Sequence, residues 1–235
     1  NVDSDLYRSH PDWVIEIPGK AHSEGRNQRI LDLTRKDVQD HIIEEMGRVF
    51  SSADISYVKW DMNRSVDNVY SAADPTLSQG AIRHKYVLGL YEVMEDMLNR
   101  YPDLLIEGCS GGGGRFDAGM LYYTPQIWCS DNTDAIERLR IHYGTSFGYP
   151  MSSVSAHVSV CPNHQNGRVT PFKTRGICAM QGSFGYELDL SKLSEEDITA
   201  PCILNRSVNT APMTQVTRTP RNVPETAEAH LRSNP

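Results

Sequence analysis

The stretch 57–64, Tyr-Val-Lys-Trp-Asp-Met-Asn-Arg, constrains the fold more than any other part of the chain. It begins with β-branched and aromatic residues, which favour a strand. It ends in polar groups, of which Asp61 is the first. Parallel α/β folds place their chemistry where a buried strand runs out into such a polar tip. Lys59 lies two residues earlier and therefore faces the same side of the strand, where its charge would keep a carboxylate ionised.

An ionised aspartate held at a strand end is suited to act as a nucleophile, so Asp61 is a candidate catalytic residue. The alternative is a structural role, because a lone aspartate after a strand more often caps the helix that follows. Asp61 alone does not separate these two interpretations, and the rest of the chain must do so.

Strands and helices are predicted to alternate along the chain. Apolar residues at helical spacing indicate amphipathic helices, with Thr34 as the expected N-cap of the first. The expected helices cover 35–50, 79–100, 134–142 and 172–182, the last with Pro171 at its first position. The expected strands cover 55–61, 104–109, 126–129, 151–160 and 184–190. Residues 1–30 are polar and rich in Pro and Gly, and we expect a long loop there.

This alternation, with short turns, predicts an α/β fold with a parallel sheet and right-handed crossovers. Several of the strands end in polar or glycine-rich turns, as strands do at the carboxyl end of a (β/α) barrel. Five strands do not close an eight-stranded barrel. We therefore expect a TIM-type (β/α)8 barrel that is incomplete, formed by residues 1–197. Residues 198–235 are rich in Pro, Thr and Asn without an apolar period, which predicts a disordered tail.

Composition excludes several classes of function. The net charge of −7 argues against a nucleic-acid backbone or an anionic membrane as partner. No apolar run approaches the roughly 20 residues that a membrane span needs, and the chain does not open on a signal-peptide pattern. The five cysteines include no CxxC pair, which argues against a zinc site and is typical of reduced thiols in a cytoplasmic protein. We expect no metal or organic cofactor.

A second carboxylate follows the strand at 126–129. It is Asp131, in the run Ser130-Asp-Asn-Thr-Asp134. Two strand-end carboxylates that face one cleft are the minimum apparatus for glycoside hydrolysis: one attacks the anomeric carbon or activates water, and the other protonates the leaving oxygen. Asp134 is the local competitor, but it lies where a helix N-cap is expected, so Asp131 is preferred.

Other candidates carry weaker signals. The run Cys109-Ser-Gly-Gly-Gly-Gly-Arg115 lacks the order of a phosphate-binding loop, although its glycines would allow close approach of a sugar ring. Cys109 could line a pocket or be a small buried residue. His157 and His164 have no metal-ligand spacing and are expected to be hydrogen-bonded loop residues. Arg26 lies in a polar loop, where a solvated side chain is the alternative to a binding role.

The chain resembles the bacterial α-galactosidases of glycoside hydrolase family 36. The resemblance runs from residue 1 to about Asp197 and rests on a long, ordered series of motifs. They are Ser4-Asp-Leu-Tyr7, His10-Pro-Asp-Trp-Val14, Gly25-Arg-Asn-Gln28, Leu31-Asp-Leu33, Tyr57–Arg64, Cys109-Ser-Gly-Gly-Gly, Arg115-Phe-Asp117, Ser130-Asp-Asn-Thr-Asp-Ala135, Tyr143-Gly-Thr-Ser146, His164-Gln and Gly167-Arg-Val-Thr170.

The resemblance implies a retaining glycosidase built on a (β/α)8 barrel, of which this chain would carry strands four to eight. It implies that Asp61 is the nucleophile and that Asp131 is the general acid/base. It also implies galactose contacts from four further residues: Arg26, Lys59, Asn63 and Cys109. The loop after Cys109 would lie beside the 2-position of the sugar and favour galactose over N-acetylgalactosamine. Full-length relatives are expected to form homo-oligomers.

We therefore expect a retaining exo-α-galactosidase that acts on terminal α-galactosyl units of the melibiose or raffinose type. One alternative is a related transgalactosylase or α-N-acetylgalactosaminidase. The other is of a different class: a truncated, catalytically incompetent chain that at most binds sugar, because strands one to three of the barrel, with an aspartate pair expected to hold the galactose hydroxyls, are not among these residues.

Overall fold

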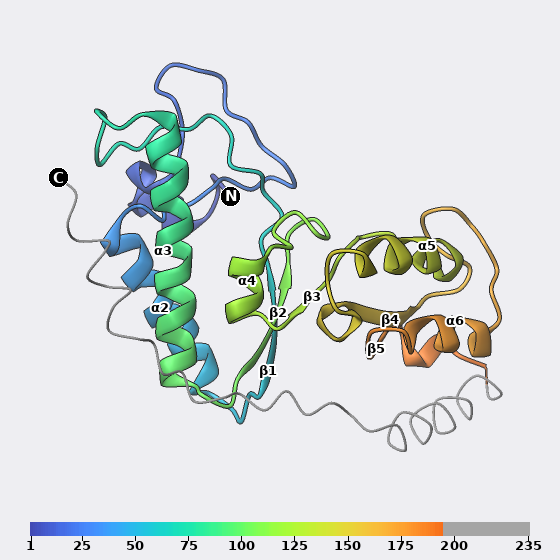
Figure 1. The fold of residues 1–235 in the computed structure, drawn as a ribbon. Helices are drawn as coiled ribbons and strands as arrows, with labels where there is room; N and C mark the ends of the chain where they lie inside the picture. Colours follow the sequence, from blue (N-terminus) through green and yellow to red (C-terminus); the bar gives the residue numbers. More distant parts are fainter. Residues whose placement is uncertain (195–235) are drawn as a thin grey trace.

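The computed structural model describes residues 1–194, which form parallel strands joined by helices (Figure 1). The strands are β1 (Tyr57–Asp61), β2 (Leu105–Cys109), β3 (Gln126–Ile127), β4 (Ser155–Ser159) and β5 (Ser183–Glu187). The α-helices are α1 (Asp5–Ser9), α2 (Lys36–Phe50), α3 (Gln79–Arg100), α4 (Ala118–Tyr123), α5 (Ala135–Ser146) and α6 (Phe172–Ala179). Short 3-10 turns are η1 (Pro11–Trp13), η2 (Met151–Ser153) and η3 (Leu190–Lys192).

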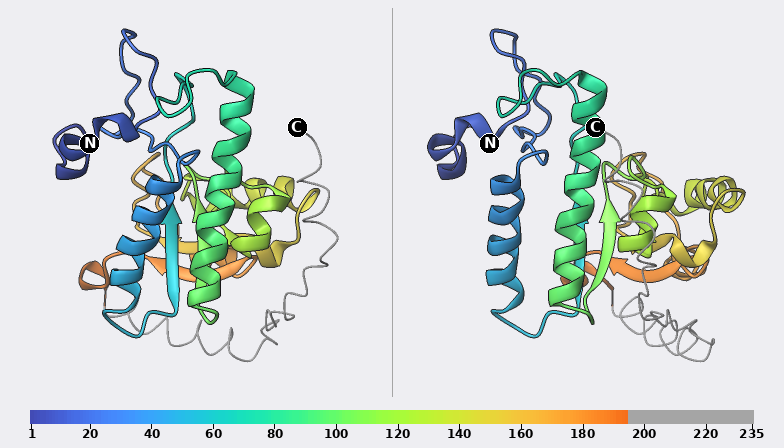
Figure 2. Two further views of the ribbon diagram at one scale, coloured as in Figure 1. Left: turned by 90° about the vertical axis from the view of Figure 1, so that its left-hand side faces the viewer. Right: turned by 60° about the vertical axis from the view of Figure 1, so that its left-hand side comes forward.

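All strand pairs in the described residues are parallel, as the alternation predicts. One sheet has the order β1-β2-β3 and a second pairs β4 with β5. A parallel bridge between Ile127 and Val154 joins the two sheets. In both orientations of Figure 2, β5 runs at a steep angle to β1 and β2, so the strand direction changes along the series. Such progressive tilting is how a parallel sheet begins to curl into a barrel.

Helices α2 and α3 cover one face of β1 and β2 and form the main core with them (Figure 2). The apolar residues that recur at helical spacing along α3 are all buried: Ile82, Tyr86, Leu90, Val93 and Met97. Burying an aliphatic side chain of this size contributes about 1.5–3 kcal/mol, so this stripe fixes α3 against the sheet. The serine before α3 caps it, since the Ser78 side chain accepts from the amide of Ala81. A smaller core joins β4 to α6 through Ala156, Val158, Phe172 and Ala179.

The structure corrects the expectation for residues 1–30 and for the start of α2. The segment expected to be a loop contains α1 and η1, which are too short to show a helical period. Helix α2 begins after Arg35, which makes no side-chain capping bond, so the prediction of Thr34 as N-cap is wrong. The Thr34 hydroxyl instead donates to Asp32 at 2.6 Å, within the turn that precedes the helix.

Two further details differ from expectation around the later helices. Helix α4 was not predicted, because its six residues are also too few to show periodicity; Asp117 caps it by accepting from the amide of Met120. Pro171 is the N-cap of α6 rather than its first helical residue. The predicted strands are all present, with ends trimmed by a few residues.

The fold is an incomplete (β/α) barrel, as predicted. In the described residues β1 and β5 each pair on one side only. Their side chains nevertheless meet across the concave face, where Nζ of Lys59 lies 4.0 Å from Oε1 of Glu187. The predicted tail, 198–235, lies outside the described residues. Within residues 1–194, no helix is both long and apolar enough to cross a membrane.

Candidate active site

Asp61 lies at the carboxyl end of β1, on the face away from the helices. The residues Tyr57, Lys59 and Asp61 share this more exposed face, as the period of two predicts. The parallel register places Lys59 beside Glu107 and Asp61 beside Cys109. The side-chain positions that follow from the sequence of β1 are therefore confirmed, whereas the roles of these residues stay predictions.

Two neighbouring donors hold the carboxylate of Asp61. Nδ2 of Asn63 donates to its Oδ2 at 2.8 Å. The thiol of Cys109 also contacts Asp61, and burial together with this hydrogen bond raises the pKa of Cys109 to about 11. Cys109 is therefore a neutral donor at physiological pH. Asn63 in turn accepts from the backbone amide of Gly111 at 2.9 Å, which ties the end of β1 to the loop after β2.

The glycine-rich loop after β2 packs against the backbone that carries Asp131. Gly112 has a φ of +76°, and a Cβ built there would lie 2.8 Å from the amide nitrogen of Asp131. A Cβ at Gly113 would lie 2.6 Å from the carbonyl oxygen of Cys129. Only glycine fits at such distances. The close approach that these glycines permit is therefore between two loops of the chain, and it brings the ends of β2 and β3 together.

Asp131 and Asp134 have different surroundings. The Asp131 carboxylate is half exposed, with Nη2 of Arg26 at 3.9 Å from its Oδ2. Asp134 is buried, caps α5 by accepting from two backbone amides, and pairs with Nη1 of Arg168 at 2.6 Å. The predicted capping role of Asp134 is confirmed. Asp131 alone of the two keeps a carboxylate open to a ligand.

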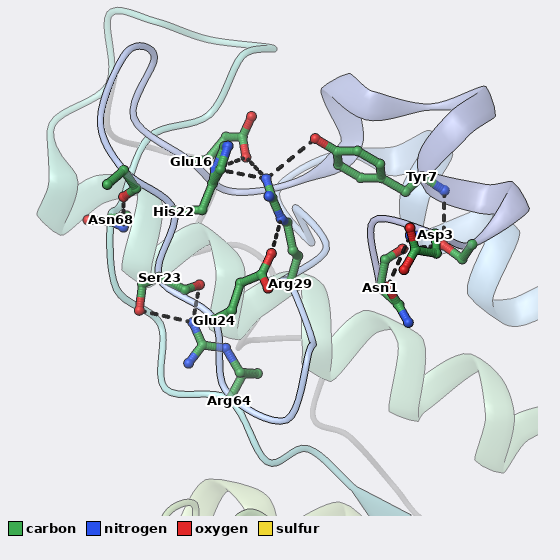
Figure 3. A network of polar contacts seen from close by, with 12 residues as sticks. Asn1, Asp3, Tyr7, Glu16, His22, Ser23, Glu24, Arg29, Arg64 and Asn68 are labelled. Atoms are coloured by element: carbon green, nitrogen blue, oxygen red, sulfur yellow. Dashed lines mark hydrogen bonds and ion pairs between the residues drawn. The ribbon is translucent and has the colours of Figure 1, made fainter.

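Arg26 reaches Asp131 from a tight hairpin whose ends, Gly25 and Gln28, form an antiparallel bridge. The two central residues have positive φ, +55° at Arg26 and +56° at Asn27, which is the pattern of a type I′ turn. Asparagine tolerates this conformation, but for arginine it costs on the order of 1–2 kcal/mol. Surrounding contacts must offset that cost, and Figure 3 shows a polar network at the base of the hairpin.

Lys59 lies deeper on the concave face, within a group of polar side chains that sequence reasoning missed. Its ammonium lies 5.5 Å from the ring centre of Trp128 and close to Glu187. His157 stacks on Trp128 and bonds Glu187 through Nδ1 at 3.0 Å. His157 is therefore a strand residue of the interior, not the loop residue that was expected, whereas His164 is exposed.

Glu107 is the most buried member of this group, with 1% of its side-chain area exposed. Tyr57 donates to its Oε2, while its Oε1 has no hydrogen-bond partner within the described residues. Burial raises the pKa of Glu107 to about 7 and lowers that of His157. For Glu187, burial opposes ionisation, but the bond from His157 and the charge of Lys59 outweigh it and lower the pKa. The one sequence feature that could have indicated this buried group is a glutamate within the otherwise apolar strand 104–109.

A cavity of about 240 Å³ opens beside Asp61, along the unpaired edge of β1. Asp61, Asn63 and Arg64 line one end, and the hairpin stem at Gln28 and Arg29 lines another. The rest of its wall is mostly apolar, from α2, α3, residues 30–33, Trp60 and Met62, and it also includes Arg115. In the described residues no cluster of three or more His, Cys, Asp or Glu side chains is placed to hold a metal ion.

The structure thus brings the six predicted site residues to one end of the strands. Five of them are connected through Asp61 or Asp131: Asp61 itself, Asn63, Cys109, Asp131 and Arg26. Lys59 lies one pleat below Asp61 on the same face. Fold and site together define an incomplete (β/α) barrel with two carboxylates at the carboxyl ends of its strands.

Comparison with known proteins assigns the family. The sequence model of the Melibiase family matches residues 1–211, and the chain belongs to this family. It is 56% identical over 197 residues to alpha-galactosidase Mel36A of Lactobacillus acidophilus. It is 60% identical over 197 residues to the bifunctional alpha-galactosidase/sucrose kinase AgaSK of Mediterraneibacter gnavus. The matches cover 84% of this chain but only 27% and 20% of those relatives, so the chain spans about a quarter of their length.

Solved structures agree with this assignment. The structure is similar to that of the GH36 alpha-galactosidase AgaA of Geobacillus stearothermophilus, with a TM-score of 0.84 and 53% identity. The similarity covers 89% of this chain and 29% of AgaA. A variant of AgaA in complex with raffinose gives a TM-score of 0.83 over the same share. The predicted resemblance to family 36 and the predicted barrel are therefore confirmed.

Proposed function

We propose that this chain carries the catalytic carboxylates of a retaining exo-α-galactosidase. The observation that supports the proposal is that both residues with candidate carboxylates are tied to one loop, the glycine-rich loop after β2. Asp61 reaches Gly111 through Asn63, and the backbone of Asp131 packs on Gly112. Two exposed carboxylates at the ends of β1 and β3, on either side of the loop after β2, suit a double displacement.

In this mechanism Asp61 attacks the anomeric carbon of a terminal α-galactosyl unit. The bond from that carbon to the leaving oxygen breaks while Asp131 gives its proton to that oxygen, and a galactosyl ester of Asp61 forms. Asp131 then takes a proton from water, whose oxygen attacks the anomeric carbon and releases Asp61. Two inversions restore the original configuration. We expect the carboxyl groups to lie about 5–5.5 Å apart in the intact barrel, and a separation near 9 Å would exclude this mechanism.

Galactose recognition is assigned to Arg26, Lys59, Asn63 and Cys109. All four present hydrogen-bond donors, and Asn63 also has an acceptor oxygen, which suits the hydroxyls of a sugar. Variants of AgaA were solved in complex with raffinose and with stachyose, which supports α-galactosides of this type as substrates here. No step of the double displacement requires a metal or organic cofactor. We place the protein in the cytoplasm and expect the intact enzyme to be a homo-oligomer.

The second candidate is a chain that is catalytically incompetent by itself. The unpaired edges of β1 and β5, together with a cavity that lies open along β1, favour it. We expect low or no turnover of an aryl α-galactoside by the 235-residue chain, and activity once the remaining barrel strands of a relative are joined to it. The division into a barrel, 1–197, and a tail, 198–235, belongs to the same proposal.

The test compares this chain, and a chimera in which it replaces the matching segment of a full-length relative, on an aryl α-galactoside. Asp61→Ala should abolish turnover in the chimera, and added azide should restore it by giving the β-galactosyl azide, because azide attacks from the side that the missing carboxylate leaves open. Asp131→Ala should spare substrates with good leaving groups. If the Asp61→Ala chimera gave galactosyl azide of α-configuration, or kept its turnover without azide, the proposal would be contradicted. Robust turnover by the isolated chain would exclude the second candidate.

A further inference from the structure

Arg64 is the last residue of the motif that contains Asp61, and the catalytic proposal gives it no role. Its side chain is largely buried, with 16% of its area exposed. It points away from the strand end toward the base of the Arg26 hairpin, where Nη2 donates to the carbonyl oxygen of Ser23 at 2.7 Å (Figure 3). The same nitrogen lies 3.3 Å from Oδ1 of Asp67, whose other oxygen accepts from the Ser23 hydroxyl at 2.5 Å.

The backbone at Arg64 is bound to the loop after β2. Nη2 of Arg115 donates to the Arg64 carbonyl at 3.1 Å, and Nη1 of Arg115 donates to the Met62 carbonyl at 2.7 Å. The hydroxyl of Ser110 donates to the same Met62 oxygen at 2.6 Å. The segment 62–64 is thereby tied both to the loop after β2 and to the hairpin, which are otherwise far apart in the sequence.

The hairpin needs such support, because Arg26 has a backbone conformation that arginine rarely adopts. Arg29 holds the stem from the other side: its Nη1 donates to Glu16 at 2.6 Å and its Nε donates to Glu24 at 3.0 Å (Figure 3). Arg29 also contacts His22 and Tyr7 of α1, and so ties the stem to the N-terminal segment. Arg64 instead links the stem to the loop after Asp61. A Cβ at Gly25 would lie 3.0 Å from Nη1 of Arg64, so the stem leaves room for this guanidinium.

We propose that Arg64 is a positioning residue that couples the Arg26 hairpin to the loop after Asp61 and so holds the Arg26 guanidinium over Asp131. The proposal rests on the proposed function, because Arg26 matters to activity only if Asp131 lies in a sugar site. A hairpin that is free of Arg64 relaxes toward an unstrained turn. Arg26 then leaves Asp131, and the enzyme loses a substrate contact without losing either catalytic carboxylate.

The first test needs no activity and uses the 235-residue chain. Hydrogen exchange of the Gln28 amide, which donates to Gly25 across the hairpin at 3.0 Å, reports hairpin opening. Loss of the charge-assisted bonds in Arg64→Met should speed this exchange about tenfold or more. Arg48→Met is the matched control. Within residues 1–194 Arg48 pairs only with Glu45 on α2, so the substitution should leave exchange of the Gln28 amide unchanged. An unchanged rate in Arg64→Met would overturn the proposal.

A second variant guards against a general loss of structure. Gly25→Ala retains Arg64 but pushes on its guanidinium, and it should speed Gln28 exchange in the same direction by a smaller factor. Exchange of the α3 amides should stay unchanged in both variants, because α3 does not contact the hairpin stem through these groups. Faster exchange throughout α3 in Gly25→Ala and Arg64→Met alike would show a structural role only and would overturn the proposal.

The functional test is a double-mutant cycle in the chimera. Arg64→Met should raise KM about tenfold with kcat little changed, as expected when a binding contact common to ground and transition states is lost. In an Arg26→Met background the same substitution should have almost no further effect, and Arg64→Lys should restore part of the loss. Additive effects of the two substitutions would refute positioning through Arg26. Turnover that survives Asp61→Ala would instead refute the proposed function, so the two failures are distinguishable.

Discussion

Glu107 offers the sharpest test of the interior described above, because its charge state couples directly to stability. Its pKa in the folded protein is about 7, against an ordinary value of 4.5, and burial is the main cause. Below pH 4.5 the carboxyl is protonated in both the folded and the unfolded state, so its ionisation does not change the free energy of unfolding. As the pH rises toward 7, the unfolded chain ionises while the folded protein keeps its proton. Folding therefore becomes less favourable over this window and levels off above it.

The shift of 2.5 pH units, from 4.5 to 7, corresponds to about 3 kcal/mol. Solvent on the concave face of the open sheet reduces the expected effect to about 2 kcal/mol. Glu107→Gln removes the titration while it keeps the size and a hydrogen-bonding group. Urea unfolding at pH 4.5, 6, 7 and 8 should show that the stability of Glu107→Gln relative to the unmodified protein increases by about 2 kcal/mol from the lowest to the highest pH.

One control variant and the opposite pH dependence of His142 separate this effect from other titrations. Glu44→Gln, at an exposed position on α2, is the matched control for the substitution itself. His142 has a pKa lowered to about 4, chiefly by burial, so its contribution runs the other way. Above pH 6.5 His142 is neutral in both the folded and the unfolded state. As the pH falls toward 4, only the unfolded chain gains the proton, so the free energy of unfolding declines. A pH-independent difference for Glu107→Gln, or one that declines with rising pH, would show that Glu107 is not held in a buried, proton-retaining environment.

Three further outcomes follow from the packing. Gly89→Ala should destabilise the protein by about 2–3 kcal/mol in urea unfolding, because its Cβ would lie 1.9 Å from the carbonyl oxygen of Leu33 where α3 crosses the start of α2. Asp134→Ala should cost about 2 kcal/mol through loss of the α5 cap and of the Arg168 pair, and Asp134→Asn should recover the capping part. Cys109 should react with iodoacetamide at pH 8 about a hundredfold more slowly in the folded protein than in urea, since a pKa near 11 instead of 9 lowers the thiolate fraction; equal rates would contradict its burial.

Sequence patterns predict well those features that depend on neighbouring residues. The polar end of β1, the capping role of Asp134 and the buried stripe of α3 all follow from spacing within one element, and each is confirmed. The short elements α1 and α4 escape prediction for the same reason, since five or six residues do not establish a period. The resemblance to family 36 supplied the barrel, which local patterns indicated only through the alternation of strands and helices.

Contacts between distant loops could not be predicted in this way. Arg26 meets Asp131 because a strained turn directs it there, and nothing in the sequence of that turn indicates positive φ at an arginine. The same holds for Glu107 and His157, which approach each other only because the strand register and the curvature of the sheet turn both to the concave face. The sequence shows that both are polar residues within apolar strands. Their charge state and contacts, however, depend on side chains from other strands.

The polar character of this concave face bears on how activity depends on the rest of the barrel. Lys59 and Glu187, on the first and last strands of the series, have 31% and 53% of their side-chain areas exposed. Charges that are open to water attract one another weakly, whereas the same pair at lower effective dielectric is held several times more strongly. Strands that close the barrel would remove water from this pair. Lys59 would then be fixed beside Asp61 by electrostatics that the open sheet does not provide. In the proposed enzyme, closure therefore strengthens the interactions among residues that this chain already contains.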